Sequence, residues 1–587
     1  MMQKDRDLLF LPPLLAIISF VALFFFRSVD DNRLTSWQWV FRHADPVKVF
    51  LILLAGCGCI TIFSWYCTGE GRSLYRSPCP GEMTQNGCVP SISVVRRSFP
   101  ILLFLFFFSC AMLFWGMPEV IVDASRYFTQ AKYLERFGVG YFLHEWGGEI
   151  QAWTDLPLIP FFYGLIFRVL GESRSYVQFF TTSLFAMTGV LTYMTGRTLW
   201  DEETGIYGAA FLLCIPYLFT QVPLMLVDVP TMFFLMLSLY TFIKALKCGG
   251  IWMGLSSLSI FFTFLSKYSA WLMLSVLPVI YFVFAFSKEE PKTRTCISRA
   301  VVTASAACLL IGIFLLANYH LIREQIGLLL SYQKPALERW EESFLSTFLF
   351  QIHPLVTATA LYSGYVAVKK RDLKYIIILW LVLVIVLLQI RRIRYIIMVF
   401  PLICLMASYG LRYVRSTEAK KVFVSCAVVS SLVIASFGYL PFLQKLSAEN
   451  LKKAGEFLDT RNASEVEVYI LQPDDPAGNL IVTVPLIDLF TRKTILHNDD
   501  LTSGQTKQAV WQSPLRFTWQ FRNPSYYRSP DIGWGADIVA IVSESAKEPL
   551  PLYLHNRLAG FELVKSFDDY EGIFRLRSSV RVYEKKM

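Results

Sequence analysis

Residues 118–127 read Pro-Glu-Val-Ile-Val-Asp-Ala-Ser-Arg-Tyr, and they open a polar passage that runs to Leu158. The passage begins directly after an apolar run that ends at Met117. Asp123 is therefore expected a few residues beyond a membrane surface, where a carboxylate is a functional candidate. The alternative is an ordinary solvated loop that starts with an aspartate at a helix N-terminus.

A helical pattern follows Asp123. Its apolar positions are Tyr127, Phe128, Ala131 and Leu134. Its charged positions are Arg126, Lys132, Glu135 and Arg136, and Gly138 and Gly140 come next. Glycines in that place are typical of a helix end. The pattern predicts a short amphipathic helix that lies in the plane of the membrane interface.

The composition is that of a polytopic membrane protein. Of the 587 residues, 55% are hydrophobic and only 17% are charged, and the mean hydropathy is +0.47. A net charge of +10 would suit a nucleic-acid partner. The Lys and Arg residues lie mostly at the ends of apolar runs, however, as orientation signals do, so nucleic acid is excluded.

Apolar runs long enough, or nearly long enough, to cross a membrane recur along the chain. They fall roughly at 9–26, 48–67, 99–117, 176–199, 205–222, 229–246, 251–266, 269–286, 299–317, 346–368, 374–390, 395–413 and 420–440. We therefore predict an α-helical polytopic membrane protein with about thirteen transmembrane helices. The apolar segment 156–170 is shorter and contains Pro157 and Pro160, which predicts a re-entrant or interfacial helix.

The Lys and Arg residues also predict the orientation of these helices. They gather in the loops that follow the second, sixth, eighth, tenth and twelfth runs, and these loops share one side if the N-terminus is cytoplasmic. The outer face then carries the 118–175 loop, the residues around Asp228, the 318–345 loop and the C-terminal region.

One basic cluster departs from this rule. Arg391, Arg392 and Arg394 join the eleventh and twelfth runs on the predicted outer side, where arginine is normally scarce. Without acidic neighbours in the sequence they indicate a bound anion, and a phosphate at the membrane surface is the natural candidate. The alternative is pairing with acidic loop residues or lipid headgroups. Lys267 is a second outward cation, and simple snorkelling to the interface is its alternative.

Asp228 lies in Val227-Asp228-Val229-Pro230, at the outer end of an apolar run. An aspartate shortly before a proline often caps a helix. In apolar, membrane-embedded surroundings an unpartnered carboxylate is costly. We therefore expect Asp228 to share a site with a partner.

From about residue 447 the composition becomes that of a soluble α/β domain. A helix is predicted at 450–458, and strands are predicted at 466–471, 537–542, 572–576 and 580–583. The predicted organisation has three parts. Residues 1–98 are predicted to form two additional N-terminal transmembrane helices and a cytoplasmic loop. Residues 99–440 are predicted to form a transmembrane catalytic core with the outer loop 118–175. Residues 441–587 are predicted to form a soluble α/β domain outside the cytoplasm.

Several short motifs follow one another in a fixed order. They are Asp123-Ala124-Ser125-Arg126-Tyr127, Asp155-Leu156-Pro157-Leu158, Phe167-Arg168-Val169-Leu170-Gly171, Val227-Asp228-Val229-Pro230, Leu265-Ser266-Lys267-Tyr268, and Arg394-Tyr395 with Phe400-Pro401-Leu402. In order and predicted membrane side they resemble the GT-C transferases that use polyprenyl-phosphate sugars, above all the protein O-mannosyltransferases and the bacterial lipid A aminoarabinose transferases. The resemblance covers roughly residues 99–415. It departs at Ala124, where many relatives have a second carboxylate.

The resemblance implies an inverting transfer of a sugar from an undecaprenyl- or dolichyl-phosphate donor. Asp123 would accept the proton of the acceptor, and Asp228 would orient hydroxyl groups or position Asp123. The cations for the donor phosphate would be Lys267, Arg391, Arg392 and Arg394. The substrate cavity would be lined by Arg126, Tyr127, His144, Glu145, Trp146, Asp155, Tyr268 and Tyr395. For Trp146, anchoring at the membrane interface is the alternative.

The acceptor implied by the resemblance is a protein, a lipid or a glycan, and the expected location is a bacterial inner membrane with the active site and the C-terminal domain facing the periplasm or exterior. No cofactor is required, although Mg²⁺ or Mn²⁺ assists some relatives; the Asp-Ala motif offers few ligands. The alternative function is a polytopic transporter or lipid flippase with an outer domain. It predicts charged residues near mid-membrane and related halves, and neither is evident.

Overall fold

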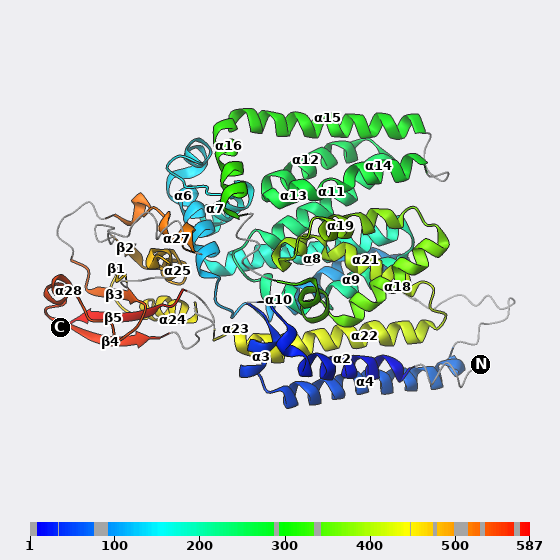
Figure 1. The fold of residues 1–587 in the computed structure, drawn as a ribbon, viewed down its shortest axis with the longest axis horizontal. Helices are drawn as coiled ribbons and strands as arrows, with labels where there is room; N and C mark the ends of the chain where they lie inside the picture. Colours follow the sequence, from blue (N-terminus) through cyan, green and yellow to red (C-terminus); the bar gives the residue numbers. More distant parts are fainter. Residues whose placement is uncertain are drawn as a thin grey trace, which may run out of the picture.

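The computed structural model describes most of the chain. The described residues are 9–32, 34–74, 92–286, 293–333, 342–445, 448–472, 478–497, 513, 515–528, 535–568 and 576–586. A bundle of helices forms one part of the molecule, and a small β-sheet with its own helices forms the other, at one end of the long axis (Figure 1). The two termini lie at opposite ends of that axis.

Helices account for nearly all of the bundle. They are α2 (Leu11–Phe25), α3 (Trp37–His43), α4 (Pro46–Leu74), α5 (Ile92–Met112), α8 (Arg174–Leu199), α9 (Glu202–Leu212), α10 (Pro216–Gln221), α11 (Asp228–Cys248), α12 (Ile251–Ser266), α13 (Tyr268–Met273), α14 (Val276–Phe286), α15 (Thr293–Ala317), α16 (Tyr319–Leu328), α18 (Pro354–Lys370), α19 (Tyr375–Leu387), α20 (Ile393–Ile396), α21 (Phe400–Leu411), α22 (Thr417–Val433) and α23 (Leu440–Leu443). Every apolar run predicted from the sequence overlaps at least one of them.

Six helical stretches in the described residues are long and apolar enough to cross a membrane, by length and composition. They are Pro46–Tyr66, Asp228–Cys248, Tyr268–Phe286, Arg294–Ala317, Ile393–Leu411 and Thr417–Leu443. Some of the other predicted runs are divided between two helices. The run at 205–222, for example, divides into α9 and α10. Pro216 begins α10, since proline suits the first turn of a helix.

Described residues near several of the loops predicted to face the cytoplasm lie together. Arg412 Nε lies 2.8 Å from Asp201 Oδ2, and Lys247 Nζ donates to the carbonyl of Thr198 at 3.2 Å. Arg299 donates to the carbonyl of Lys247 at 2.7 Å. Basic residues from three separate loops thus lie together, as the charge pattern predicts.

Near the opposite end of the bundle lies α6 (Ile121–Glu145), which packs against α7 (Leu158–Leu170). Gly138 has φ 89° and bends α6, a backbone conformation that favours glycine. The predicted helix therefore exists, but it continues beyond this glycine.

The interfacial position of α6 stays a prediction, and the structure shows that part of the charged side of this helix is covered by protein. Arg126 is 5% exposed and Lys132 is 4% exposed. The cover comes from η6 (Leu480–Thr483) and α25 (Val484–Leu489) of the C-terminal region. A local sequence pattern cannot reveal a cover that lies hundreds of residues further along the chain.

The C-terminal region contains a five-stranded sheet in the order β2-β1-β3-β5-β4. The strands are β1 (Glu465–Ile470), β2 (Thr494–Leu496), β3 (Ile538–Ser543), β4 (Phe561–Phe567) and β5 (Ser579–Lys585). β1 pairs in parallel with β2 and β3, whereas β5 pairs antiparallel with β3 and β4. The predicted strands at 466–471, 537–542 and 580–583 are present; 572–575 lie outside the described residues, and β4 was not predicted.

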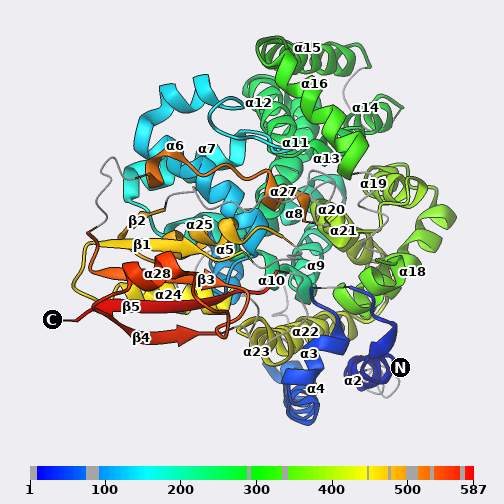
Figure 2. The same cartoon turned by 60° about the vertical axis from the view of Figure 1, so that its left-hand side comes forward.

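Helices cover both faces of this sheet (Figure 2). Leu554 of α28 (Leu552–Arg557) packs with Val539 and Ile541 on one face. Ile538 and Ala540 point to the other face, where α24 (Glu449–Leu458) and α25 lie. This alternation follows from the two-residue period of a strand and makes β3 the buried centre of the sheet.

Candidate active site

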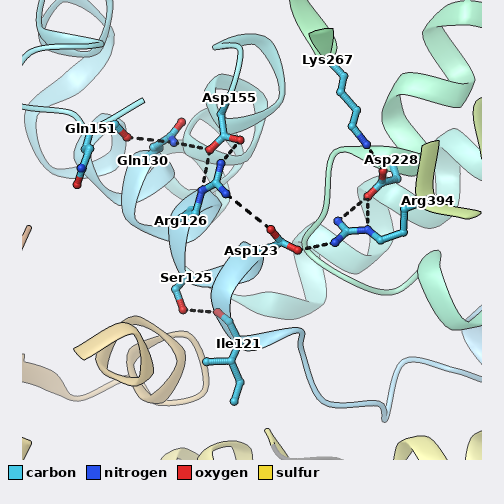
Figure 3. A network of polar contacts seen from close by, with 10 residues as sticks. All are labelled: Ile121, Asp123, Ser125, Arg126, Gln130, Gln151, Asp155, Asp228, Lys267 and Arg394. Atoms are coloured by element: carbon cyan, nitrogen blue, oxygen red, sulfur yellow. Dashed lines mark hydrogen bonds and ion pairs between the residues drawn. The ribbon is translucent and has the colours of Figure 1, made fainter. Parts of the chain in front are cut away.

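Two aspartates and two cations from four distant parts of the chain meet in one ionic cluster (Figure 3). Arg394 Nη1 lies 2.5 Å from Asp123 Oδ2, and Arg394 Nη2 lies 2.9 Å from Asp228 Oδ2. Lys267 Nζ lies 2.5 Å from Asp228 Oδ1. Arg394 therefore bridges the two carboxylates.

Each of these side chains is placed by the end of a helix. Asp123 lies in the first turn of α6, and Asp228 begins α11, two residues before Pro230. Lys267 is an extended residue, with φ −163° and ψ 140°, between α12 and α13. Arg394 lies in the short helix α20. Charged side chains at helix ends can converge without entering the apolar middle of the bundle.

The cluster continues along α6 through a second arginine. Arg126 Nη1 lies 3.8 Å from Asp123 Oδ1, and Arg126 Nε donates to Asp155 Oδ2 at 3.1 Å. Gln130 Nε2 donates to the same oxygen at 3.2 Å. The result is a line of alternating charges, Lys267, Asp228, Arg394, Asp123, Arg126 and Asp155, which we call the charge ladder (Figure 3).

Solvent exposure distinguishes the three carboxylates of the charge ladder. The side chain of Asp228 is 1% exposed and that of Asp155 is 7% exposed, whereas that of Asp123 is 23% exposed. Asp123 is therefore the carboxylate that an external molecule can reach.

The protonation of Asp123 follows from its surroundings. Burial alone would raise its pKa, but Arg394 and then Arg126 outweigh burial and hold the pKa below the ordinary value of an aspartate. At Asp155 burial outweighs the pairing with Arg126, so its pKa is raised. Asp123 is thus ionised at neutral pH and able to accept a proton.

Other predicted residues surround the charge ladder. Lys267 Nζ lies 4.6 Å from the ring centroid of Tyr395, and the Arg392 guanidinium carbon lies 5.8 Å from it. Arg391 is exposed and donates to Gln389 Oε1 at 3.0 Å. Of the three predicted arginines, Arg394 alone makes a described ion pair with the two aspartates. For the three arginines, the sequence analysis gave pairing with acidic residues as the alternative to a bound anion. Arg394 makes such pairs.

Tyr127 and Tyr268 lie on the Asp155 side of the ladder. The Tyr127 ring centroid is 5.9 Å from the Arg126 guanidinium carbon. Tyr268 donates from its hydroxyl to Gln325 Oε1, and Gln325 Nε2 donates to the carbonyl of Asp155 at 3.3 Å. Both tyrosines thus reach the ladder directly or through one side chain.

The three predicted cavity residues His144, Glu145 and Trp146 belong to a different neighbourhood. His144 is exposed, and its Nδ1 lies 2.6 Å from Glu145 Oε1. Trp146 is buried with Tyr133 and Phe142 in a small apolar cluster. Within the described part of the chain, no hydrogen bond or ion pair joins these three residues to the charge ladder. They follow the bend at Gly138, which the sequence pattern treated as the end of the helix.

Sequence reasoning missed several residues that support the site. Arg174 Nε lies 2.7 Å from the buried Glu119 Oε1, and the ring centroid of Phe517 lies 5.1 Å from the Arg126 guanidinium carbon. Glu342 Oε2 accepts from the backbone nitrogen of Ile393 at 2.9 Å. Glu119 is only four residues before Asp123 and could have been noticed, but nothing in the sequence links Phe517 or Glu342 to the site.

The described residues offer no three His, Cys, Asp or Glu side chains gathered as ligands for a metal ion. Within the charge ladder, an arginine separates each carboxylate from the next, and Arg394 and Lys267 already occupy oxygens of Asp123 and Asp228. A Mg²⁺ or Mn²⁺ ion prefers several carboxylate oxygens around one point. The arrangement therefore does not fit such an ion.

Comparisons with known proteins found one family model and several solved structures that are similar to this chain. Residues 155–322 match the family model of the dolichyl-phosphate-mannose-protein mannosyltransferases. The fold is similar to that of ArnT from Cupriavidus metallidurans in the apo state, at 12% sequence identity and a TM-score of 0.51, over 84% of this chain and 98% of that chain. The archaeal oligosaccharyltransferase AglB from Archaeoglobus fulgidus gives 10% identity and a TM-score of 0.43, over 76% of this chain and 70% of that chain. No curated protein sequence matches.

The likeness to ArnT confirms the predicted fold class, an α-helical membrane protein of the GT-C type with a small C-terminal sheet. Together with the family-model match, it supports a membrane glycosyltransferase.

Proposed function

We propose that this protein is an integral membrane glycosyltransferase that moves a sugar from a polyprenyl-phosphate donor to an acceptor at the outer face of the membrane. The observation that carries the proposal is the bridge that Arg394 makes between Asp123 and Asp228, with Lys267 on the far side of Asp228. This bridge brings the accessible carboxylate of Asp123 close to the cations Arg394 and Lys267, at one end of the helical bundle.

The reaction is a single inverting displacement. The acceptor's hydroxyl or amine forms a bond to the anomeric carbon of the sugar while the bond from that carbon to the phosphate oxygen breaks. Polyprenyl phosphate leaves with the bonding electrons, and Asp123 takes the proton of the attacking group. For a hydroxyl acceptor a carboxylate of low pKa is sufficient, because the attacking oxygen becomes a strongly acidic oxonium once its new bond forms.

Arg394 and Lys267 stabilise the charge that develops on the leaving phosphate. A guanidinium binds phosphate oxygens through parallel N–H groups, and an ammonium acts as a point charge. Fixed charges in a partly buried site stabilise a transition state more than mobile water does. Arg392 lies beside Tyr395 at the edge of the same group, and the exposed Arg391 meets the phosphate at the surface.

Asp228 acts as a positioning residue in this scheme. Its carboxylate is 1% exposed and holds both Lys267 and Arg394. A group so enclosed orients the two cations and not the acceptor. Through Arg394, Asp228 also helps to position Asp123, which is one of the two roles that the resemblance implies.

The donor reaches the site from the bilayer and the acceptor from the outer aqueous side, where the C-terminal region covers α6. We place this side in the periplasm of a bacterial inner membrane. The acceptor is a protein, lipid or glycan that presents a hydroxyl or amine.

The test compares Asp123→Asn with Glu418→Gln in purified full-length protein supplied with a polyprenyl-phosphate sugar. Asp123→Asn removes the proton acceptor and should lower kcat by at least about 100-fold, since general base catalysis typically contributes that much. Glu418→Gln alters an exposed carboxylate that pairs with Lys421 at 2.8 Å, away from the charge ladder, and should leave turnover unchanged. Normal turnover in Asp123→Asn would refute the assignment. Mass spectrometry of co-purified lipid identifies the carrier.

A further inference from the structure

The loop between α2 and α3 docks on a segment more than 300 residues away in the chain. The carboxylate of Asp30, which is 3% exposed, accepts from Ser346 Oγ, from Gln351 Nε2 at 3.0 Å and from the backbone nitrogen of Trp37 at 2.7 Å. The backbone nitrogen of Asn32 donates to Ser346 Oγ at 3.2 Å. A buried polar network thus joins the N-terminal hairpin, which runs from α2 to α4, to 342–351.

The same segment holds the loop that carries Arg394. Glu342 is buried, and its Oε2 accepts from the backbone nitrogen of Ile393 at 2.9 Å. Ser343, the next residue, donates from its backbone nitrogen to Asp31 Oδ1 at 3.0 Å. Segment 342–351 therefore has the N-terminal hairpin on one side and the arginine loop on the other.

We propose that the N-terminal hairpin positions Arg394 through this chain of contacts, with Asp30 and Glu342 as positioning residues. The proposal rests on the function proposed above, in which Arg394 meets the donor phosphate. Arg394 must satisfy Asp123 and Asp228 at once, at 2.5 and 2.9 Å. Such a geometry tolerates little displacement, and small displacements of catalytic groups reduce rates strongly.

Asp30 is well suited to fix the hairpin. Its two oxygens accept four hydrogen bonds, two from the hairpin's own backbone and two from side chains of 342–351. Buried carboxylates need such partners, and losing one leaves a buried donor unsatisfied. The network is therefore sensitive to the loss of a single acceptor.

The test compares Asp30→Asn with Asp45→Asn in the full-length protein. The asparagine of Asp30→Asn has an NH₂ group in place of one carboxylate oxygen. That group cannot accept a hydrogen bond from Trp37 or Ser346, whichever it faces, so some of the four hydrogen bonds are lost. Asp45 lies in the same hairpin, is exposed, and accepts only local backbone bonds from Val47 and Lys48. We expect Asp30→Asn to lower kcat/KM for the lipid-phosphate donor about threefold to tenfold, the usual effect of one hydrogen bond, because Arg394 both aims Asp123 and meets the phosphate. Asp45→Asn should leave kcat/KM unchanged.

A second readout needs no donor and so separates this proposal from the proposed function. Hydrogen exchange of a peptide that covers 391–396 reports the backbone bond between Ile393 and Glu342. Exchange should be about threefold to tenfold faster in Asp30→Asn. If Asp30→Asn fails to fold, Ser346→Ala provides the same test, because it removes one partner of Asp30 and keeps the carboxylate. It should also make exchange of the 391–396 peptide faster. The proposal would be overturned, even if sugar transfer is established, if Ser346→Ala changed neither the exchange rate nor kcat/KM. Equal changes in Asp45→Asn and Asp30→Asn would overturn it as well.

Discussion

Arg394 is the side chain on which the geometry of the two aspartates depends. Its Nη1 contacts Asp123, while its Nη2 and Nε both donate to Asp228 Oδ2, at 2.9 and 3.3 Å. A planar guanidinium can hold two carboxylates at a fixed separation, whereas an ammonium has no such fork. Arg394 therefore determines where the more exposed carboxylate, Asp123, points.

The pKa of Asp123 gives a prediction for Arg126→Gln. In the wild type the pKa of Asp123 lies below its ordinary value, so kcat/KM should show no acid limb from this group above about pH 4. Without Arg126, the burial that raises the pKa is opposed by fewer charges. The acid limb of kcat/KM should then appear at higher pH, and activity should fall as the pH drops through it.

Arg168→Gln is the matched control for this experiment. Arg168 Nη1 donates to the carbonyl of Glu135 at 3.1 Å, further along α6 and away from Asp123. Its profile of kcat/KM against pH should match that of the wild type. An unshifted acid limb in Arg126→Gln would mean that Asp123 is not the group that titrates in the reaction.

At the scale of elements, the buried Lys132 is one of the side chains that link α6 to the C-terminal region. Lys132 Nζ lies 2.5 Å from Asp488 Oδ2 of α25 and 3.1 Å from Glu172, just beyond α7. The Tyr527 hydroxyl donates to Asp488 at 2.6 Å. Burial and then Asp488 raise the pKa of Glu172 to about 8. Lys132 Nζ lies closer to Asp488 than to Glu172.

Lys132→Met should weaken the docking of the C-terminal region. It leaves Asp488, which is 1% exposed, as a buried carboxylate without its cation. Breaking a buried pair by removing one partner typically destabilises a protein by about 3–5 kcal/mol. The midpoint of thermal unfolding in detergent should fall, and limited proteolysis should release the C-terminal region sooner.

The control is Lys453→Met, which makes the same substitution at a lysine of an exposed ion pair. Lys453 is 56% exposed and lies 3.4 Å from Glu449. Exposed pairs contribute about 0–1 kcal/mol, so the midpoint should hardly change. Equal effects of the two substitutions would show that the buried pair does not hold α6 to the C-terminal region.

At the scale of the whole molecule, local signals in the sequence predicted the bundle and the centre of the charge ladder. Apolar runs identify helices because their signal is local. Asp123, Asp228, Lys267 and Arg394 could be selected because ionised groups at the ends of such runs are costly without partners. Which cation pairs with which carboxylate, and the burial of Lys132, depend on packing between distant segments. No local pattern records that packing.

The orientation of the molecule in the membrane gives the last prediction. Arg394 contacts Asp123, so both lie on one side of the bundle, and the basic loops around Lys247 and Arg412 meet at one end. If that end is cytoplasmic, Lys369→Cys, exposed at the end of α18, should resist a membrane-impermeant maleimide in spheroplasts. Glu562→Cys, exposed on β4, should react. The parent protein, with its native cysteines, sets the background. If Lys369→Cys is labelled from outside and Glu562→Cys is protected, the protein has the opposite orientation in the membrane. The proposed site would then lie on the cytoplasmic face.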